Sequence, residues 1–193
     1  AVVEPLTEAD LARAVEAAHA AEPEAVAVCL LFSWIDPAHE RALGRAFEGV
    51  APVTLSSDLL PETGEYERGL ATWLNAWLVP RTGRYLARLR SALKPAGSGS
   101  GPRLEIMHSA GGTYPVEEAE RRPARLILSG PAGGLTAARA LARADGPERL
   151  LTFDMGGTST DVGLVDGDVA LTTASRIGPF PLALPMFDLH TIG

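Results

Sequence analysis

The segment 150–173 constrains the fold most strongly, because three strand-like apolar runs follow one another in it with only short turns between them. The runs are Leu150–Phe153, Asp161–Val165 and Val169–Thr173. Turns this short join antiparallel neighbours, whereas parallel strands need a crossover of about a dozen residues or more. The segment therefore predicts an antiparallel meander.

The first turn of this meander carries residues suited to bind phosphate. It reads Asp154-Met-Gly-Gly-Thr-Ser-Thr-Asp161. The two glycines, Gly156 and Gly157, allow a sharp turn and let a ligand approach the backbone closely. Backbone N–H groups and three hydroxyls offer donors to phosphate oxygens; the hydroxyls belong to Thr158, Ser159 and Thr160.

Two carboxylates flank the turn and would repel a bare phosphate. We therefore expect a divalent cation, Mg²⁺ carried by a nucleotide, between Asp154, Asp161 and the phosphates. The Lys of a Walker loop and the G-x-G-x-x-G spacing of a dinucleotide site are both missing here. A plain hairpin turn with polar neighbours is the alternative for the glycine pair alone; the whole set of residues favours a phosphate site.

The first 55 residues alternate between helical and strand-like patterns. Thr7 is suited to cap a helix, Ala25–Phe32 is a continuous apolar run, Asp36-Pro37 opens a helix to about Glu48, and Pro52–Leu55 is a short strand. An unbroken apolar run is typical of a strand covered on both faces. The pattern predicts the α/β class with a mainly parallel sheet.

A polar loop and two helical segments follow. We expect the loop at Ser56–Arg68 and the helices at 66–77 and 80–93. Trp73 and Trp77 give the first helix an apolar stripe, which favours a place in the core over a ligand-binding cage.

The glycine- and serine-rich run Gly97–Gly101 predicts a flexible linker, and we expect domains at 1–96 and 97–193. Beyond it the patterns predict strands at Leu104–Met107 and Arg125–Leu128, a helix at Val116–Arg121, and a small-residue helix opened by Ser129-Gly-Pro-Ala-Gly-Gly134.

Composition excludes several classes of protein. The formal net charge is −7, and no clustered Lys or Arg offers a surface for nucleic acid. The longest apolar run, Ala25–Phe32, is too short to cross a membrane. Cys29 is the single cysteine, as expected of a thiol in a reducing compartment, and we expect a cytoplasmic protein. The chain begins at Ala1 without an initiator Met, so we interpret it as a piece of a longer protein.

Several strings together resemble one protein family. The turn Phe153–Asp161, preceded by Ser129–Gly134, resembles the second phosphate loop and connecting helix of the actin, sugar-kinase and heat-shock-chaperone ATPase superfamily. More narrowly, the chain is similar to the large, ATP-using (hydantoinase A type) subunit of the hydantoinase/5-oxoprolinase family. The strings that narrow the resemblance are Pro61–Arg68, Leu74-Asn-Ala76, Met107–Gly112 and Pro185–Gly193.

This resemblance implies a ribonuclease-H-like (actin-like ATPase) mixed sheet with flanking helices in two lobes, preceded by an N-terminal βα segment. It also implies ATP and Mg²⁺ in the cleft and ATP-dependent hydrolysis of a cyclic amide, such as a hydantoin, N-methylhydantoin or 5-oxoproline, through phosphorylation of its carbonyl oxygen. A second, hydantoinase B type subunit is the implied partner. A ketone carboxylase of the same family and a non-enzymatic nucleotide-binding module of the actin or chaperone kind are the alternatives.

The resemblance also implies roles for individual residues. Asp154 and Asp161 would be catalytic, organising Mg²⁺ or the attacking group. The residues expected to bind the cofactor are Gly156, Gly157, Thr158, Ser159 and Thr160 of the turn, with Gly130, Gly133 and Gly134 at the junction of the lobes.

Three features depart from the family pattern. His108-Ser-Ala-Gly-Gly112 stands where the pattern has Gln-Ser-Asn-Gly-Gly, and neither a first phosphate loop nor the glycine-rich adenosine loop is present. The sequence thus holds about half of a nucleotide site, and we predict that the isolated chain neither turns over ATP nor cleaves hydantoin.

Asp188-Leu-His190 is a second candidate for metal binding. Residues two apart on a strand project to the same side, so Asp188 and His190 are placed to share a second metal ion, such as a transition metal. Hydrogen bonding at a strand end is the favoured alternative. His19 and His39 lie in polar helical patterns and are predicted to be surface residues.

Overall fold

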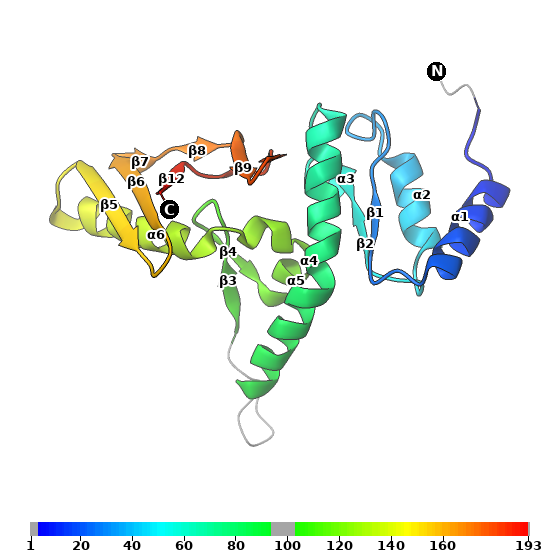
Figure 1. The fold of residues 1–193 in the computed structure, drawn as a ribbon, viewed down its shortest axis with the longest axis horizontal. Coiled ribbons are helices and arrows are strands. Elements are labelled where there is room, and N and C mark those ends of the chain that lie inside the picture. The colour runs from blue at the N-terminus through cyan, green and yellow to red at the C-terminus, as the bar shows by residue number, and fades with distance from the viewer. Residues whose placement is uncertain (1–3, 94–102, 193) are drawn as a thin grey trace. The chain divides into compact units, whose positions relative to one another are not determined.

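The computed structural model describes residues 4–93 and 103–192. The chain divides into two compact units, 1–88 and 89–193, which Figure 1 shows in one ribbon. The predicted boundary at residue 97 lies outside the described residues and stays a prediction. No helix in the described ranges is both long and apolar enough to cross a membrane.

The first unit contains a parallel pair of strands and the helices around it. Its elements are α1 (Glu8–Ala21), β1 (Val26–Val28), α2 (Ala38–Ala46), β2 (Val53–Leu55), α3 (Ser56–Leu59) and α4 (Glu65–Ala92), of which α4 continues past residue 88. Strand β1 runs parallel to β2, with Val26 opposite Val53. The predicted alternation and the parallel pairing are confirmed.

Thr7 caps α1 as predicted. Its hydroxyl accepts a hydrogen bond from the Asp10 backbone N–H at 3.2 Å, and the Asp10 carboxylate accepts one from the Thr7 N–H at 2.9 Å. This reciprocal pair satisfies donors that a helix start leaves free. His19 of α1 and His39 of α2 are exposed, as the sequence predicted.

The first strand is shorter than predicted. β1 ends at Val28, and the chain then turns, with Phe32 in the left-handed region at φ 58°. The backbone of Leu30 is bound by side chains and not by a ladder: its N–H donates to Glu40 at 2.8 Å, and its carbonyl accepts from Arg68 at 2.6 Å. Ala25–Phe32 as one continuous strand was therefore wrong.

Glu40 organises this part of the unit although it is fully buried, at 0% exposure. Besides the Leu30 N–H, its carboxylate accepts the Ser56 hydroxyl at 2.6 Å and the Ser57 N–H at 2.8 Å. Burial alone raises the pKa of Glu40, but these hydrogen bonds outweigh it and hold the pKa below its ordinary value. The carboxylate thus joins the turn after β1 and the start of α3 to α2.

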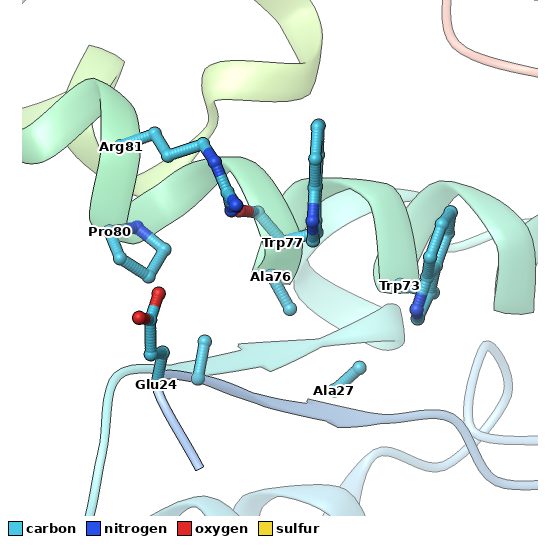
Figure 2. A pocket seen from close by; sticks show the side chains of 8 residues that line it. Glu24, Ala27, Trp73, Ala76, Trp77, Pro80 and Arg81 are labelled. Atoms are coloured by element: carbon cyan, nitrogen blue, oxygen red, sulfur yellow. The ribbon is translucent and has the colours of Figure 1, made fainter.

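Helix α4 differs from the prediction in two ways. It is one continuous helix with Pro80 inside it, and the predicted polar loop before it contains α3. Most of its buried residues are small or polar, and one of them, Asn75, donates its amide N–H to the Thr54 hydroxyl of β2 at 3.0 Å. Trp73 and Trp77 (Figure 2) are 55% and 47% exposed, so their placement in the core was wrong.

The second unit is built around a small antiparallel sheet. Its elements are β3 (Glu105–Met107), β4 (Thr113–Pro115), α5 (Val116–Arg121), the 3₁₀ helix η1 (Pro123–Leu126), α6 (Ser129–Asp145), β5 (Arg149–Met155), β6 (Thr160–Asp166), β7 (Asp168–Val169), β8 (Leu171–Thr172), β9 (Ser175–Ile177), β10 (Phe180–Leu182), β11 (Met186–Phe187) and β12 (Leu189–Ile192). The main sheet has the order β12-β6-β5, with β7 also paired to β6.

The meander is confirmed, since β5, β6 and β7 pair antiparallel in sequence order. The third predicted strand is divided: β7 ends at Val169, and β8 pairs with β11 instead. Helix α6 covers one face of the sheet through a core of Ala132, Leu135, Val165, Val169 and Phe187.

The strand predicted at Arg125–Leu128 was wrong, because η1 covers Arg125 and Leu126 and a turn follows at Ile127 and Leu128. The Arg125 carbonyl accepts hydrogen bonds from the Ser109 N–H at 2.8 Å and the Ser109 hydroxyl at 2.7 Å. The segment therefore stabilises the turn after β3 and does not pair with a strand.

Candidate active site

The two predicted catalytic carboxylates face each other across the β5–β6 hairpin. Asp154 of β5 lies directly opposite Asp161 of β6, in register. Directly opposed residues on antiparallel strands have their Cβ atoms roughly 5 Å apart and share one face of the sheet, and like charges in this arrangement repel. The strands therefore hold two negative charges side by side, an arrangement that a cation would stabilise.

A third residue extends this row. Thr191 of β12 lies opposite Asp161 on its other side, and the Thr191 hydroxyl donates a hydrogen bond to Asp161 Oδ1 at 2.6 Å. We call Asp154, Asp161 and Thr191 the carboxylate row. The hydroxyl fixes one oxygen of Asp161, whereas the Asp154 carboxylate accepts no hydrogen bond from any described residue.

The two carboxylates of the row line a cavity between the sheet and the start of α6. The cavity has a volume of about 330 Å³ and is lined by Pro131, Gly134, Leu135, Thr152, Phe153, Asp154, Asp161 and Leu189. Helix α6 approaches the sheet closely at Gly163, where a Cβ atom would lie 2.8 Å from a Leu135 methyl carbon. Glycine at this position lets the helix cover the row.

The predicted phosphate turn connects the two carboxylates. The Gly156 N–H donates to the Ser159 carbonyl at 2.9 Å and closes the turn. Neither Gly156 nor Gly157 has a positive φ, so the turn does not require glycine for its backbone angles. A Cβ atom on Gly157 would meet nothing within 4 Å, so the space beside this backbone is open.

The three hydroxyls of the turn do not all lie on the same side as the carboxylate row. Thr158 is exposed and Ser159 is half-buried. Thr160 pairs with Met155 and so lies on the face of the sheet opposite Asp161. Thr158 and Ser159 remain beside the turn, whereas the strand directs Thr160 away from the carboxylate row.

Of the three glycines predicted at the start of α6, only Gly134 lines the cavity. A Cβ atom on Gly134 would meet nothing within 4 Å, so its small size leaves room there. A Cβ atom on Gly133 would lie 3.8 Å from the Met107 side chain, in ordinary contact, and one on Gly130 would meet nothing.

Asp188 and His190 lie apart from the carboxylate row. His190 pairs with Val162, so strand alternation places it on the opposite face of the sheet from Asp154. Both side chains are exposed, and the Asp188 N–H donates to the Ala170 carbonyl at 2.9 Å. Within residues 4–93 and 103–192, no three His, Cys, Asp or Glu side chains lie close enough together to hold a metal ion.

The turn after β3 is shaped by close packing. Gly111 has φ +81°, and a Cβ atom there would lie 2.1 Å from the Phe187 ring. His108 stacks on Tyr114 with ring centroids 4.5 Å apart, and its Nδ1 accepts the Ala110 N–H at 3.2 Å. Burial lowers the pKa of His108, and the charge of Arg125 lowers it further, so the imidazole is neutral at pH 7.

Sequence reasoning missed Thr191 and Gly163. Alternation along β12 does place Thr191 on the opposite side from His190, which was a usable signal. The partner of that strand, β6, lies about thirty residues earlier, and no local sequence pattern predicts a pairing between such distant segments.

Two family models match the chain. The family model "Hydantoinase/oxoprolinase" matches residues 68–193, and the model of the N-terminal region of that family matches residues 1–50. The chain belongs to the hydantoinase/oxoprolinase family. The resemblance to this family seen in the sequence is thereby confirmed.

Relatives within the family include enzymes with different substrates. The chain is 31% identical to caprolactamase subunit alpha of Pseudomonas jessenii over 98% of its length, and 33% identical to 5-oxoprolinase 1 of Arabidopsis thaliana over 86%. It spans 27% of the caprolactamase subunit and 13% of the oxoprolinase.

Two solved structures of the family superpose on nearly the whole chain. The ATP-dependent caprolactamase of P. jessenii matches with a TM-score of 0.84 and 29% identity, covering 100% of this chain and 28% of that one. The nucleotide-free structure of acetone carboxylase matches with a TM-score of 0.79 and 28% identity, covering 99% of this chain and 28% of that one. The mixed α/β class is therefore confirmed.

Proposed function

We propose that this chain forms part of the nucleotide site of an ATP-dependent enzyme that hydrolyses a cyclic amide. The observation that carries the proposal is the carboxylate row, which faces a cavity of about 330 Å³ beneath the start of α6. Hydrolysis of a lactam is the activity named for the caprolactamase relative, and ATP dependence is named for its solved structure. We also propose the ribonuclease-H-like arrangement for the full-length protein.

The residues present fit Mg²⁺ bound to a nucleotide. Asp154 and Asp161 supply the oxygen ligands that Mg²⁺ prefers, and a cation between them would remove their mutual repulsion. Mg²⁺ usually keeps several waters and binds proteins through one or two carboxylates plus substrate phosphates, so a pair of carboxylates is a sufficient protein contribution.

Each element of the site has a distinct task in this proposal. When bound, ATP supplies the phosphoryl group that converts the amide carbonyl into a better electrophile. Asp154 and Asp161 would balance the charge of the metal, and the Thr191 hydroxyl orients Asp161. The open backbone at Gly157 lets a phosphate approach the N–H groups of the turn, and Gly134 leaves space on the helix side.

A ketone carboxylase is the second candidate, favoured by the likeness to acetone carboxylase at a TM-score of 0.79. ATP dependence is named for both solved relatives, so the same carboxylate row would serve either reaction. The two candidates differ in the substrate pocket.

For the full-length protein we further propose a partner subunit of the hydantoinase B type. Subunit names of relatives support it, since the caprolactamase relative is a subunit alpha and the acetone carboxylase relative a subunit beta. A cytoplasmic location is proposed on the single Cys29.

The test is ATP hydrolysis by the purified full-length protein with three kinds of substrate. Lactams and cyclic imides such as caprolactam, 5-oxoproline and hydantoin form the first arm, acetone with bicarbonate the second, and unfolded peptide the third. Stimulation by the first arm with ring opening supports the proposal, and stimulation by the second supports the carboxylase. ATP hydrolysis that responds only to peptide or to polymerisation would instead indicate a non-enzymatic module.

A further inference from the structure

Ser109, in the turn after β3, is a buried residue that connects two distant segments of the second unit. It is only 1% exposed. Its N–H and its hydroxyl both donate to the Arg125 carbonyl of η1, at 2.8 Å and 2.7 Å, and its own carbonyl accepts the Phe187 N–H of β11 at 2.8 Å. These hydrogen bonds offset the cost of burying the polar groups and link η1 to β11.

The two linked segments lead into the two walls of the cavity at the carboxylate row. η1 comes just before α6, whose first turns supply Pro131 and Gly134 to the lining. β11 comes just before β12, which supplies Leu189 to the lining and Thr191 to the carboxylate row. The hydrogen bonds of Ser109 thus fix the start of α6 relative to β12.

The same turn also touches α6 and β11 through Gly111. A Cβ atom on Gly111 would lie 2.1 Å from the Phe187 ring and 2.8 Å from Thr136 Oγ1 of α6, so both side chains pack directly on this backbone. The Thr136 hydroxyl donates to the Gly111 carbonyl at 3.3 Å as well as to the Ala132 carbonyl at 2.8 Å. The turn is therefore in contact with α6 and with β11.

The entry into α6 needs such support, because its backbone is strained. Leu128, the residue before α6, has φ 60° and ψ 22°, in the left-handed region that bulky side chains disfavour. Conformations of this kind persist only where the surrounding structure holds them. The two hydrogen bonds from Ser109 to Arg125 hold the segment just before Leu128, so without the hydroxyl we expect the first turn of α6 to open more often.

Ser109 itself does not line the cavity. Thr136, which binds the turn, and Gly134, which lines the cavity, are two positions apart on α6. Two positions correspond to a rotation of about 200° in an α-helix, so the turn and the cavity lie on nearly opposite sides of α6. A part of Ser109 in the site is therefore one of positioning.

We propose that Ser109 is a positioning residue, which sets the distance between the start of α6 and β12 and thereby the width of the cavity at Asp154 and Asp161. The effect of Ser109 on a bound metal–nucleotide complex rests on the proposed function. Its effect on the two walls of the cavity does not, so the two can be tested separately.

The first test is backbone hydrogen exchange of the full-length protein with Ser109→Ala, which removes only the hydroxyl. We expect the Ala132 and Phe187 amides to exchange at least about tenfold faster than in the wild type, because they bind the Leu128 carbonyl at the start of α6 and Ser109 itself. The Gly167 amide, hydrogen-bonded in the turn between β6 and β7, is the control and should not change. Unchanged rates at Ala132 and Phe187, or equal acceleration at Gly167, would overturn the proposal.

Steady-state kinetics of substrate-dependent ATP hydrolysis give the second readout. In the full-length protein, Ser109→Ala should raise the KM for Mg²⁺–ATP about fivefold, because displaced walls hold the complex less closely. Partial unfolding alone would lower the apparent kcat and leave the KM unchanged, so an unchanged KM contradicts a positioning role. Thr113→Val, which removes an exposed hydroxyl that donates to Glu105 in the same hairpin, is the matched control and should change neither constant.

Asp154→Asn separates the failure of this proposal from the failure of the proposed function. If Asp154→Asn leaves kcat and the KM for Mg²⁺–ATP at wild-type values, the proposed function is wrong, and the hydrogen exchange of Ala132 and Phe187 alone decides whether Ser109 holds the two walls. If Asp154→Asn is impaired while Ser109→Ala matches the wild type in both measurements, the proposed function stands and the role of Ser109 is overturned.

Discussion

Two carboxylate sites, one in each unit, show how differently this chain uses the same chemical group. Glu40 is fully buried, and three hydrogen bonds from Leu30, Ser56 and Ser57 satisfy its oxygens. Asp154 and Asp161 instead face each other at the edge of a cavity, and only Asp161 receives a hydrogen bond from a described residue. A carboxylate whose bonding is complete holds the fold together, whereas a like-charged pair that the fold leaves open is placed to bind a cation.

The largest expected effect comes from the open pair. In the full-length protein, Asp154→Asn and Asp161→Asn should each lower kcat of substrate-dependent ATP hydrolysis about a thousandfold, because the amide cannot replace the charge that holds the metal. Neither change should lower the free energy of unfolding, because each removes a repulsive partner. Steady-state kinetics and urea unfolding on the same preparations measure both. If the free energy of unfolding falls in proportion to kcat, the two aspartates stabilise the fold, as Glu40 does, and do not bind a cation.

At Glu40 we expect the opposite result, a loss of stability. Glu40→Gln should lower the free energy of unfolding of the 193-residue chain by about 2 kcal/mol. The glutamine amide has one oxygen and one NH₂ group, so one of the backbone N–H groups of Leu30 and Ser57 would lose its acceptor and face another donor. Glu48→Gln, an exposed position two residues after α2, is the control and should change little. Urea unfolding followed by circular dichroism checks this. An unfolding midpoint that Glu40→Gln does not shift would show that the three hydrogen bonds contribute nothing net.

The pH dependence of stability should reveal the same site. The folded pKa of Glu40 lies below its ordinary value, so its contribution is fully present above the unfolded glutamate pKa of about 4.3 and is lost as pH falls through the lower folded pKa. The stability difference between the wild type and Glu40→Gln should therefore be constant near neutrality and shrink below about pH 4. A difference that instead grows on acidification contradicts a lowered pKa.

A smaller effect on kcat is expected at Thr191, whose hydroxyl binds Asp161. Thr191→Val removes the hydroxyl that orients Asp161 and should lower kcat of the full-length protein about tenfold, the equivalent of one charge-assisted hydrogen bond. Thr191→Ser keeps the hydroxyl and should restore most of the rate. If the serine variant is as slow as the valine variant, packing and not the hydrogen bond explains the loss.

The smallest effect should come from the other face of the sheet. Strand register places His190 away from Asp154, and Asp188 is exposed and does not line the cavity, so Asp188→Asn and His190→Ala should leave kcat and KM within about twofold of the wild type. A large loss of activity in either variant would show that the substituted residue takes part in the active site.

Local sequence patterns predicted much of this contrast. The meander and the helix Val116–Arg121 follow from neighbouring residues alone, and both are found in the structure. The role of Glu40 was not foreseen, because its partners lie ten and more residues away in the sequence.

The remaining errors share one physical cause. The apolar run Ala25–Phe32 and the segment Arg125–Leu128 both have strand composition, but distant side chains or loops bind their backbone groups. Trp73 and Trp77 have the helical spacing of core residues, yet both are about half exposed, and it is the smaller Asn75 that contacts Thr54 of β2. Tertiary hydrogen bonds and side-chain size, which no local pattern contains, decided each case.

Binding of Mn²⁺ with ATP to the full-length protein, followed by electron paramagnetic resonance with Mn²⁺ in place of Mg²⁺, tests the central claim most directly. If the carboxylate row holds the metal of a nucleotide, the wild type and Asp188→Asn should bind the Mn²⁺–ATP complex equally well, and Asp154→Asn and Asp161→Asn at least about tenfold more weakly. Equal affinity in all four proteins would contradict the claim that this row is a metal–nucleotide site.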